Sequence, residues 1–537
     1  MKILLPRGME SVTTLQVIPL DLNDTDVERM MTRILELAVK RGRSASSRVN
    51  TSEYEKYLDA LANSPQLVGF HDAEGKRILD GWIKAAVVRE EKSGRGHAGT
   101  HMGFIRPRTI AAYRSGLPKE RSRNRRADAL AFQSVLLAMG GEDADLRKVS
   151  VLFTDTFGKG VDIGAAPWHQ PKYDEKTPID IEALLTLRFL EGFEGSQHPK
   201  DSERNIPPLP VPAAVLPLGK DLVAYLSQYG PKVEVGESFT HVQAIISLRL
   251  FQLPLITARV IRGLLSGDEV KISSNPCEIY CDFTHIKGSE SDRISALCVQ
   301  RDLQIMQTFF RDRILLRELE NTAAAAPGLV SPGTQSTAEE KLQWMAQLRN
   351  DARIQFGIGY RLQEILNMQS GDEERDFVQE VLNTPQISNA DKLATIVAEA
   401  NGKRGLMSQI SWFHTTGGIT KNYGVLAGTL RARTTWRYSL SDEALTSLLL
   451  RCFTDEAGTR VIPKMTMRKL LDTLENRFGI LIDKPPREMQ TASAYAAAQE
   501  NFAAFTNRLK LLGWYEGLTD DFSAQYVTQP RVLSDER

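Results

Sequence analysis

The sequence predicts a mainly helical α+β protein with several domains and a winged-helix-like module in its C-terminal third. Three observations favour this fold class. Apolar residues recur at the 3.6-residue period of helices through most of the chain, whereas only short runs read as strands. Two segments rich in proline, glycine and other small residues interrupt these patterns. At roughly 100–200 residues per domain, the 537 residues correspond to three or four domains.

The two interrupting segments divide the chain. Proline at the density found in 194–217 favours extended backbone, and the small residues of 321–340 leave little to pack. We therefore predict the following order: a basic N-terminal α+β domain at 1–193, a Pro-rich linker at 194–217, a middle α+β domain at 218–320, a flexible linker at 321–340, and a helical C-terminal region at 341–537.

Individual elements follow from apolar spacing and from capping residues. Helices are predicted at 22–64 (two helices), 127–139, 178–193, 290–319, 339–368, 374–383 and 389–400. Strands are predicted at 67–70, 269–273 and 278–283. The long apolar stretch 244–265 contains three arginines and Pro254, so it predicts buried helices and not a membrane span.

The winged-helix-like module is predicted at 441–484. Ser441 can cap a helix, a short strand TRVI follows at 459–462, Pro463 or Thr466 opens a second helix, and ILID at 480–483 reads as a strand. In winged helices the second helix can enter a DNA major groove. Its candidate DNA-contacting residues are Lys464, Arg468 and Lys469, with Arg477 on the same helix. Many such modules bind proteins instead.

Composition limits the classes of function. The 67 basic and 67 acidic residues give a net charge of zero, so any DNA contact must come from a local patch. Four cysteines are too few for a disulfide-built fold and fit a reducing compartment. The N-terminus does not resemble a signal peptide, so we expect a cytoplasmic protein without a membrane partner.

The most basic part of the chain runs from Lys84 to Arg126. It holds twelve Lys or Arg against three Glu, and such a patch suits phosphate backbones. Its candidate DNA-binding residues are Arg106, Arg108, Arg114, Lys119, Arg121, Arg123, Arg125 and Arg126. An acidic partner protein and a plain solvated surface are the alternatives.

A second arginine-rich run lies at 412–438. Arg431, Arg433 and Arg437 alternate in a strand-like segment and are expected to share one face. Arg431 and Arg433 are therefore further DNA-binding candidates. Trp412 and Trp436 could stack on bases, although aromatic residues in such a chain more often fill a core.

Other chemistry-bearing residues form looser groups. Cys277, Cys281 and His285, and separately His97 and His101, have spacings that only weakly suggest a metal, and we predict neither a metal site nor a cofactor. The acids Asp282, Glu290 and Asp292 beside His285, or Asp155 and Asp162 with His169, could serve a divergent nuclease. The sequence contains no P-loop, GxSxG or kinase motif.

The runs GVLAGTLRARTTWRYSLSDEALTSLLLRCF (424–453) and RKLLDTLENRFGILIDKPP (468–486) carry a resemblance. This C-terminal third resembles accessory proteins of bacterial anti-phage islands, above all a component of the methylation-associated defence system. Accessory subunits of phosphorothioation-dependent restriction are the second possibility. The resemblance implies a partner role beside an ATPase motor, a methyltransferase or a nuclease, and it supplies no catalytic residues.

These observations lead to one main hypothesis and two alternatives. The main hypothesis is a non-enzymatic DNA-binding or scaffold subunit of a multi-protein defence complex. The alternatives are a divergent metal-dependent nuclease and a pure protein–protein adaptor for an ATPase or methyltransferase.

Overall fold

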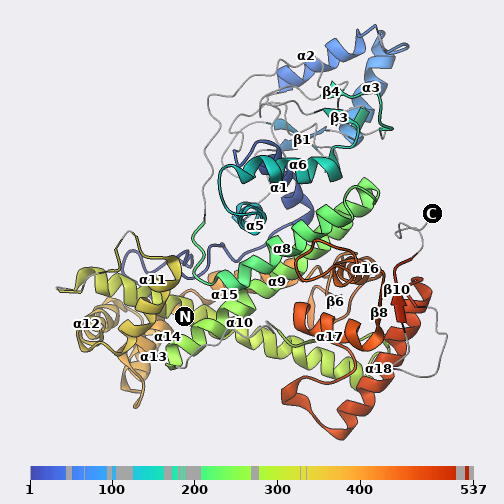
Figure 1. Cartoon of the computed structure of the whole chain (residues 1–537). Coiled ribbons are helices and arrows are strands. Elements are labelled where there is room, and N and C mark those ends of the chain that lie inside the picture. The colour runs from blue at the N-terminus through green and yellow to red at the C-terminus, as the bar shows by residue number, and fades with distance from the viewer. Residues whose placement is uncertain are drawn as a thin grey trace.

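Two long helices, α9 (Val235–Ser266) and α10 (Glu290–Ala325), form the centre of the molecule (Figure 1). The computed structural model describes residues 2–43, 51–65, 67–86, 88–92, 100–104, 125–162, 172–179, 183–184, 187, 207–267, 277–326, 328–329, 331–333, 335–515 and 526–530. Buried apolar side chains from most of this range form one contiguous core, to which the described residues of 51–104 and 161–187 do not contribute.

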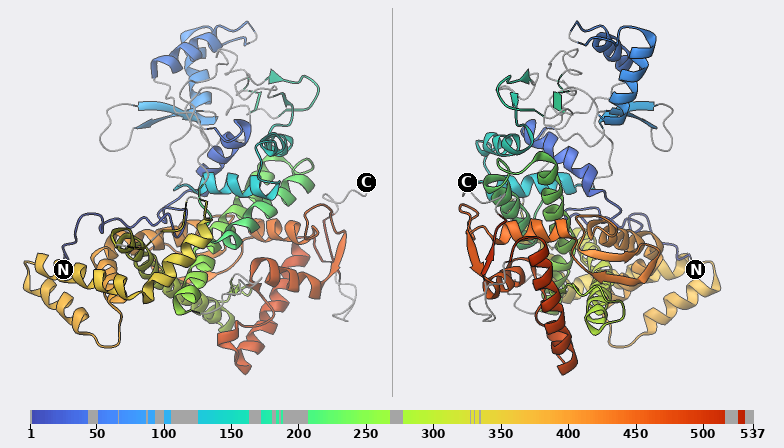
Figure 2. Two further views of the ribbon diagram at one scale, coloured as in Figure 1. Left: turned by 60° about the vertical axis from the view of Figure 1, so that its left-hand side comes forward. Right: turned by 90° about the vertical axis from the view of Figure 1, so that its right-hand side faces the viewer.

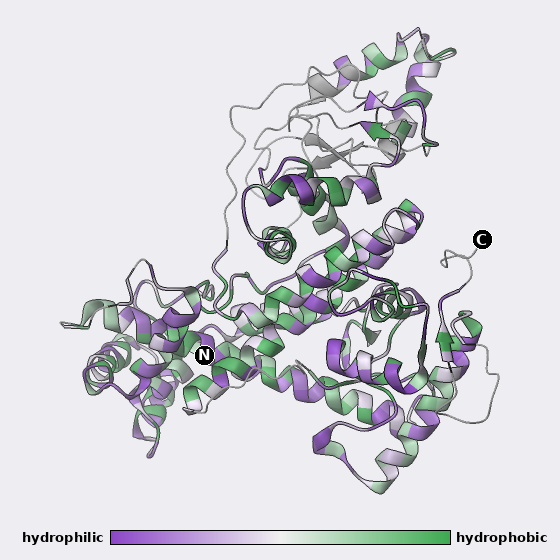
Figure 3. Cartoon of the chain, viewed as in Figure 1, coloured by the Kyte–Doolittle hydropathy of each residue, from purple (hydrophilic) through white to green (hydrophobic). Residues whose placement is uncertain are grey.

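The sequence of α9 explains its central place. The helix is apolar around nearly its whole circumference, and it is long and apolar enough to cross a membrane by length and composition alone. In the fold, 94% of its most apolar window is buried, which is typical of a core helix. Figure 3 colours the chain by hydropathy and shows hydrophobic residues along the central helices. The helix ends at Gly267, whose φ of 75° is the left-handed conformation that suits glycine. The prediction of a buried helix at 244–265 is confirmed.

The N-terminal lobe packs against one end of this centre (Figure 2). The lobe's helices are α1 (Val27–Val39), α2 (Thr51–Ala62), α3 (Ala73–Ala86), α5 (Ala127–Ala138) and α6 (Asp145–Phe157). Two hairpins, β1 (Val88–Lys92) with β2 (Thr100–Phe104) and β3 (Val161–Asp162) with β4 (Lys172–Tyr173), complete its regular elements. Helix α8 (Pro212–Gln228) joins the lobe to α9. A Cβ at Gly219 would lie 1.9 Å from the carbonyl oxygen of Ser134, so glycine lets α8 approach α5 closely.

A helical lobe surrounds the C-terminal half of α10. Its elements are α11 (Ala338–Gln347), the 3₁₀ turn η1 (Leu348–Asn350), α12 (Ala352–Met368), α13 (Asp372–Asn383) and α14 (Asn389–Ala400). The capping chemistry is local. Thr337 and Glu340 form a capping box on α11, and Asp351 and Ser388 cap α12 and α14.

The C-terminal lobe lies on the other side of α9 and α10. It contains α15 (Gly402–Thr416), β6 (Leu426–Thr429), β7 (Ala432–Tyr438), α16 (Asp442–Cys452), β8 (Lys464–Thr466), α17 (Met467–Phe478), β9 (Ile480–Leu481), η2 (Arg487–Met489), α18 (Ala492–Leu511) and β10 (Tyr526–Thr528). The two helices predicted for the 441–484 module are present as α16 and α17. The predicted strand TRVI forms only an isolated bridge, and the strand that follows it, β8, pairs antiparallel with β10. The predicted strand ILID contains β9, which pairs parallel with β5 (Ile279–Tyr280). Within the described residues the two strands therefore do not form the paired wing of a winged helix.

The first residues of the chain cross over the C-terminal half. The backbone N–H of Lys2 donates to Glu374 on α13, and that of Leu4 donates to Gln369 after α12. Farther along, Arg317 of α10 donates to the carbonyl oxygens of Met9 and Ser11. The N-terminal segment thus ties the lobe of α11–α14 to the start of the N-terminal lobe.

Most predicted helices are confirmed, while three details differ. The LVGF run at 67–70 is bend and turn and not a strand, because α3 begins directly after it. TRVI at 459–462 forms only one isolated bridge, between Val461 and Thr454. Helices α8 and α10 extend into the two predicted linkers, 194–217 and 321–340. The strand predicted at 269–273 and most of the helix predicted at 178–193 lie outside the described residues. The five-part domain division stays a prediction.

Candidate nucleic-acid interface

The β6–β7 hairpin presents Arg431 and Arg433, two of the predicted DNA-binding residues. Its strands pair in the register Leu426↔Tyr438 and Thr429↔Ala432, with an irregularity between 427 and 429. Gly428 permits this irregularity. Its φ is +131°, and a Cβ there would lie 2.6 Å from the carbonyl oxygen of Thr435. The tight connection through Leu430 and Arg431 leaves both of these side chains exposed at the tip.

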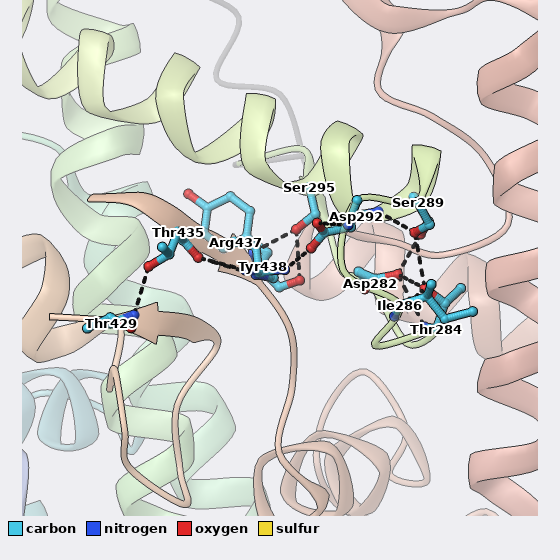
Figure 4. Close-up of polar contacts among 12 residues, drawn as sticks. Asp282, Thr284, Ile286, Ser289, Asp292, Ser295, Thr429, Thr435, Arg437 and Tyr438 are labelled. Atoms are coloured by element: carbon cyan, nitrogen blue, oxygen red, sulfur yellow. Dashed lines mark hydrogen bonds and ion pairs between the residues drawn. The ribbon is translucent and has the colours of Figure 1, made fainter. Parts of the chain in front are cut away.

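A polar network fixes the hairpin to the start of α10 (Figure 4). Arg437 forms an ion pair with Asp292, which lies in the first turn of α10. Ser295 Oγ donates to the carbonyl oxygen of Tyr438 over 2.9 Å and accepts from the Tyr438 N–H over 2.7 Å. The Tyr438 hydroxyl donates to Asp302 over 2.8 Å. These contacts give the hairpin a fixed position beside α10.

Alternation along β7 sorts its side chains as the sequence predicts. Arg433 and Arg437 lie on the outer face, and Trp436 and Tyr438 point into the core. Trp436 and Trp412 are fully buried, and each indole N–H donates to a backbone carbonyl, of Thr429 and Leu250 respectively. These tryptophans are core residues and are not available for base stacking. Arg437 differs from Arg431 and Arg433, because it forms an ion pair with Asp292 within the protein.

Helix α15 adds two basic residues that sequence reasoning missed. Arg433 Nη2 lies 3.5 Å from the sulfur of Met407 on α15, so strand β7 and this helix are neighbours. Lys403 and Arg404 lie one turn before Met407 and are exposed. We call Lys403, Arg404, Arg431 and Arg433 the α15–hairpin face. The run NGKRG at 401–405 carried a signal, but it contains too few charges to stand out in the sequence.

The predicted basic stretch 84–126 ends close to the α15–hairpin face. Arg125 forms ion pairs with Asp21 over 3.0 Å and Asp24 over 2.5 Å, and its backbone carbonyl accepts from the Asp21 N–H. The next residue after Asp24, Thr25, donates its N–H to Thr415 at the end of α15 over 3.4 Å. The last described residues of the basic stretch are therefore held beside the last turn of α15.

The pKa of His414 depends on charges from both the hairpin and the segment that binds Arg125. Burial lowers the pKa of His414, the charge of Arg433 lowers the pKa further, and the carboxylate of Asp24 opposes both effects. The ring thus lies within electrostatic reach of both an arginine of the hairpin and the aspartate that holds Arg125.

The remaining predicted DNA-binding residues fall into two groups. Arg106, Arg108, Arg114, Lys119, Arg121 and Arg123 lie outside the described residues. Among the others, Arg126 is exposed immediately before α5, and Lys469 is exposed on α17. Lys464 lies 5.0 Å from the centroid of the Tyr526 ring, and Arg468 contacts Asp472 over 3.2 Å and Asp483 over 3.7 Å.

Two of the acids proposed for a nuclease, Asp282 and Asp292, have structural partners. Asp282 Oδ1 accepts hydrogen bonds from the hydroxyls of Thr284 and Ser291, over 2.8 and 2.7 Å, and Asp282 is 1% exposed. Asp292 accepts from the Gly288 N–H over 2.8 Å besides binding Arg437 (Figure 4). Across the described parts of the chain, no three His, Cys, Asp or Glu side chains lie close enough to hold a metal ion. His97, His101 and His169 fall outside the part of the chain whose side chains are described.

All four cysteines are free and buried. Burial raises the pKa of Cys277, Cys298 and Cys452 to about 12, and that of Cys281 also rises. Such thiols remain protonated and behave as small apolar side chains, which fits the expectation of buried free cysteine.

The described residues thus define a mainly helical protein of several lobes with an exposed basic face, in which Asp282 and Asp292 are paired within the fold. The family model described as "Methylation-associated defense system protein MAD7" matches residues 7–531, and the chain belongs to this family. The resemblance noted in the C-terminal third therefore extends over nearly the whole chain. A comparison with curated proteins gives no match. The chain is a component of a methylation-associated defence system.

Proposed function

We propose that this chain is a non-enzymatic, DNA-holding scaffold subunit of its defence system. The observation that carries the proposal is the junction at the end of α15. There the basic stretch, through Arg125, Asp24 and Thr25, approaches the arginines of the β6–β7 hairpin. The described end of the basic stretch, Arg125 and Arg126, therefore lies near the hairpin arginines, which supports a shared contact with a DNA backbone.

The four residues of the α15–hairpin face suit phosphate contacts. Lys403, Arg404, Arg431 and Arg433 are all exposed, so their charges can reach a ligand without unfolding any element. Each phosphate that a basic residue neutralises contributes about 0.9 to the slope of log K against log salt. Four contacts would therefore contribute a slope of about 3.6 and a roughly 150-fold loss of affinity between 50 and 200 mM salt.

The non-enzymatic part of the proposal rests on the candidate acids. Asp282 accepts hydrogen bonds from two hydroxyl groups, and Asp292 accepts one from a backbone N–H and pairs with the guanidinium of Arg437. A metal-dependent nuclease needs carboxylates that can turn toward a metal ion. Both aspartates lie where the β6–β7 hairpin is attached to the start of α10, so their contacts support a structural role. A DNA contact through Lys464 of β8 and Lys469 of α17 is a secondary part of the proposal.

DNA binding by the full-length chain tests the proposal. Fluorescence anisotropy with a labelled duplex is measured over a salt series for the parent and for the variant in which Lys403, Arg404, Arg431 and Arg433 are all changed to Ala. We expect at least a tenfold loss of affinity at about 100 mM salt and a salt slope that falls by about 3 to 4. The charge-matched control changes the exposed residues Lys287, Lys341, Arg375 and Lys510 to Ala.

A second variant tests the basic stretch without disturbing its anchor. It changes Arg121, Arg123 and Arg126 to Ala and keeps Arg125, because Arg125 holds Asp21 and Asp24. Equal affinity and equal salt slope for the parent and both variants would contradict the DNA-holding role. Cleavage of plasmid DNA with Mg²⁺ that disappears in the Asp282→Ala variant would contradict the non-enzymatic role.

A further inference from the structure

We infer that a groove between the end of α10 and helix α12 docks an acidic amphipathic helix of another subunit. The inference rests on the proposed role as a subunit of a multi-protein complex and adds the surface and the chemistry of the partner. The groove has a volume of about 680 Å³, and residues of both helices line it, among them Thr322, Ala325, Arg353, Phe356, Tyr360 and Arg361. We call it the α10–α12 groove.

Two aromatic rings stand exposed at this groove. Phe356 is 83% exposed and Tyr360 is 75% exposed, and their spacing of four residues places them on one face of α12. The next most exposed aromatic residue among the described side chains, Trp82, is only 54% exposed. Exposed aromatic pairs of this kind are costly in water and typical of protein interfaces.

The groove is preformed. Its apolar lining includes the small residues Ala325, Ala326 and Ala352. Gly357 lets α12 lie against α10, since a Cβ there would meet the Thr322 methyl group at 3.0 Å. Arg361 fixes the same contact by donating to the Thr322 hydroxyl over 3.0 Å. A partner helix can therefore insert aliphatic side chains at i and i+4 without rearranging the backbone.

Charge selects an acidic partner. The charged side chains that line the groove are both basic: Arg353 lies one turn before Phe356, and Arg361 directly follows Tyr360. Arg353 pairs with Asp351 over 2.8 Å but keeps 54% of its side chain exposed, and Asp351 is not among the lining residues. Glu318, which neutralises Arg361 over 2.7 Å, also binds Arg317 over 2.7 Å, so one carboxylate serves two guanidinium groups. Glu318 is 1% exposed, so an approaching helix meets positive charge. A second copy of α12 would bring the same arginines together, which disfavours self-association.

Site-specific cross-linking of the full-length chain tests the inference. A photo-reactive benzoylphenylalanine replaces Tyr360, the chain is co-expressed with the other proteins of its defence system, and cross-linked segments are mapped by mass spectrometry. We expect cross-links to a segment with aliphatic residues at helical spacing and flanking Asp or Glu. The same amino acid at Tyr495, which is 44% exposed on α18, is the control position.

Affinity measurements with the mapped partner complete the test. The Phe356→Ala/Tyr360→Ala variant is expected to bind at least tenfold more weakly, as interface hot spots do. Arg353→Glu is expected to weaken binding by a similar factor, whereas Arg375→Glu on the exposed face of α13 leaves it unchanged. Because the substituted aromatic side chains are exposed, the thermal midpoint of the variant should match that of the parent, which separates binding from folding.

Four results would overturn the inference. A complex that assembles with unchanged affinity in the aromatic variant would reject the groove but leave the scaffold role standing. Cross-links from position 360 to a second copy would identify a dimer interface instead. Loss of DNA affinity in the Phe356→Ala/Tyr360→Ala variant would assign the rings to nucleic acid. Failure of any partner to co-purify with the parent chain would reject the proposed scaffold role and the groove together.

Discussion

Replacing Asp221 with Asn is predicted to lower the free energy of unfolding by about 3–5 kcal/mol, the range found when a buried ion pair loses one partner. Asp221 lies on α8 and binds two arginines from different parts of the chain. Its Oδ2 accepts from Arg249 Nε over 2.8 Å, and its Oδ1 accepts from Arg451 Nε over 2.7 Å. All three side chains are only 3% exposed. One carboxylate therefore compensates two buried positive charges.

The surroundings make the loss difficult to repair. Arg249 also donates to Gln252 over 3.0 Å and to the carbonyl oxygen of Arg477 over 2.9 Å, so its guanidinium is held in place. Arg451 is fixed by Thr454 in the same way. Asn has nearly the shape of Asp but no charge, so the change isolates the electrostatic part of the cluster. The two guanidinium groups cannot reach water without separating α8, α9 and α16.

Urea denaturation followed by tryptophan fluorescence measures the effect. Trp412, Trp436 and Trp514 are fully buried, so their emission reports on the same core. The matched control is Asp376→Asn on the exposed face of α13, which should change stability by less than about 0.5 kcal/mol. A free energy of unfolding for Asp221→Asn within about 1 kcal/mol of the parent value, with the same denaturant slope, would refute the reasoning.

Two further predictions concern pH. Burial lowers the pKa of His241 from about 6.5 to about 4, so the folded protein loses stability as the pH falls through this range. Urea titrations at pH 7 and pH 4.5 measure the loss. In the His241→Gln variant the loss should be smaller by about 2–3 kcal/mol. Burial raises the pKa of Asp312 to about 6, so ionisation costs stability as the pH rises from about 4 to 6. Asp312→Asn should abolish this fall and add about 2–3 kcal/mol at pH 7, and a destabilised variant at that pH would show that the Arg262 ion pair dominates.

Helices were predictable from sequence because their determinants are local. The spacing of apolar residues and the caps at Ser289 and Ser441 act within a few residues of each helix start. Strand pairing depends on partners that sequence spacing does not reveal. The strand at 480–481 pairs with one near 280, and the strand at 464–466 pairs with the segment at 526–528. The order helix, strand, helix, strand therefore predicted a wing that the described residues do not form.

The candidate site was predictable in parts and not as a whole. Charge density identified the basic stretch, and alternation placed Arg431 and Arg433 on one face. Sequence spacing could not reveal that Arg437 would be taken up by Asp292, or that Arg125 would be taken up by Asp21 and Asp24. Both arginines belong to segments that the sequence predicted to bind DNA, and both form ion pairs within the protein instead. Only tertiary contacts separate a structural arginine from one that is free to bind a ligand.

The structural arginines give the proposed interface its geometry. Arg437 fixes the hairpin to α10, and Arg125 fixes the end of the basic stretch beside α15. If either anchor is lost, the exposed residues keep their charges but lose their relative positions. Arg437→Ala should therefore lower DNA affinity because the hairpin loses its fixed position. The number of basic residues that can contact DNA should stay nearly the same. Such a variant would weaken binding while keeping most of the salt slope, whereas loss of a phosphate contact lowers both. The salt slope thus distinguishes residues that touch DNA from residues that position them.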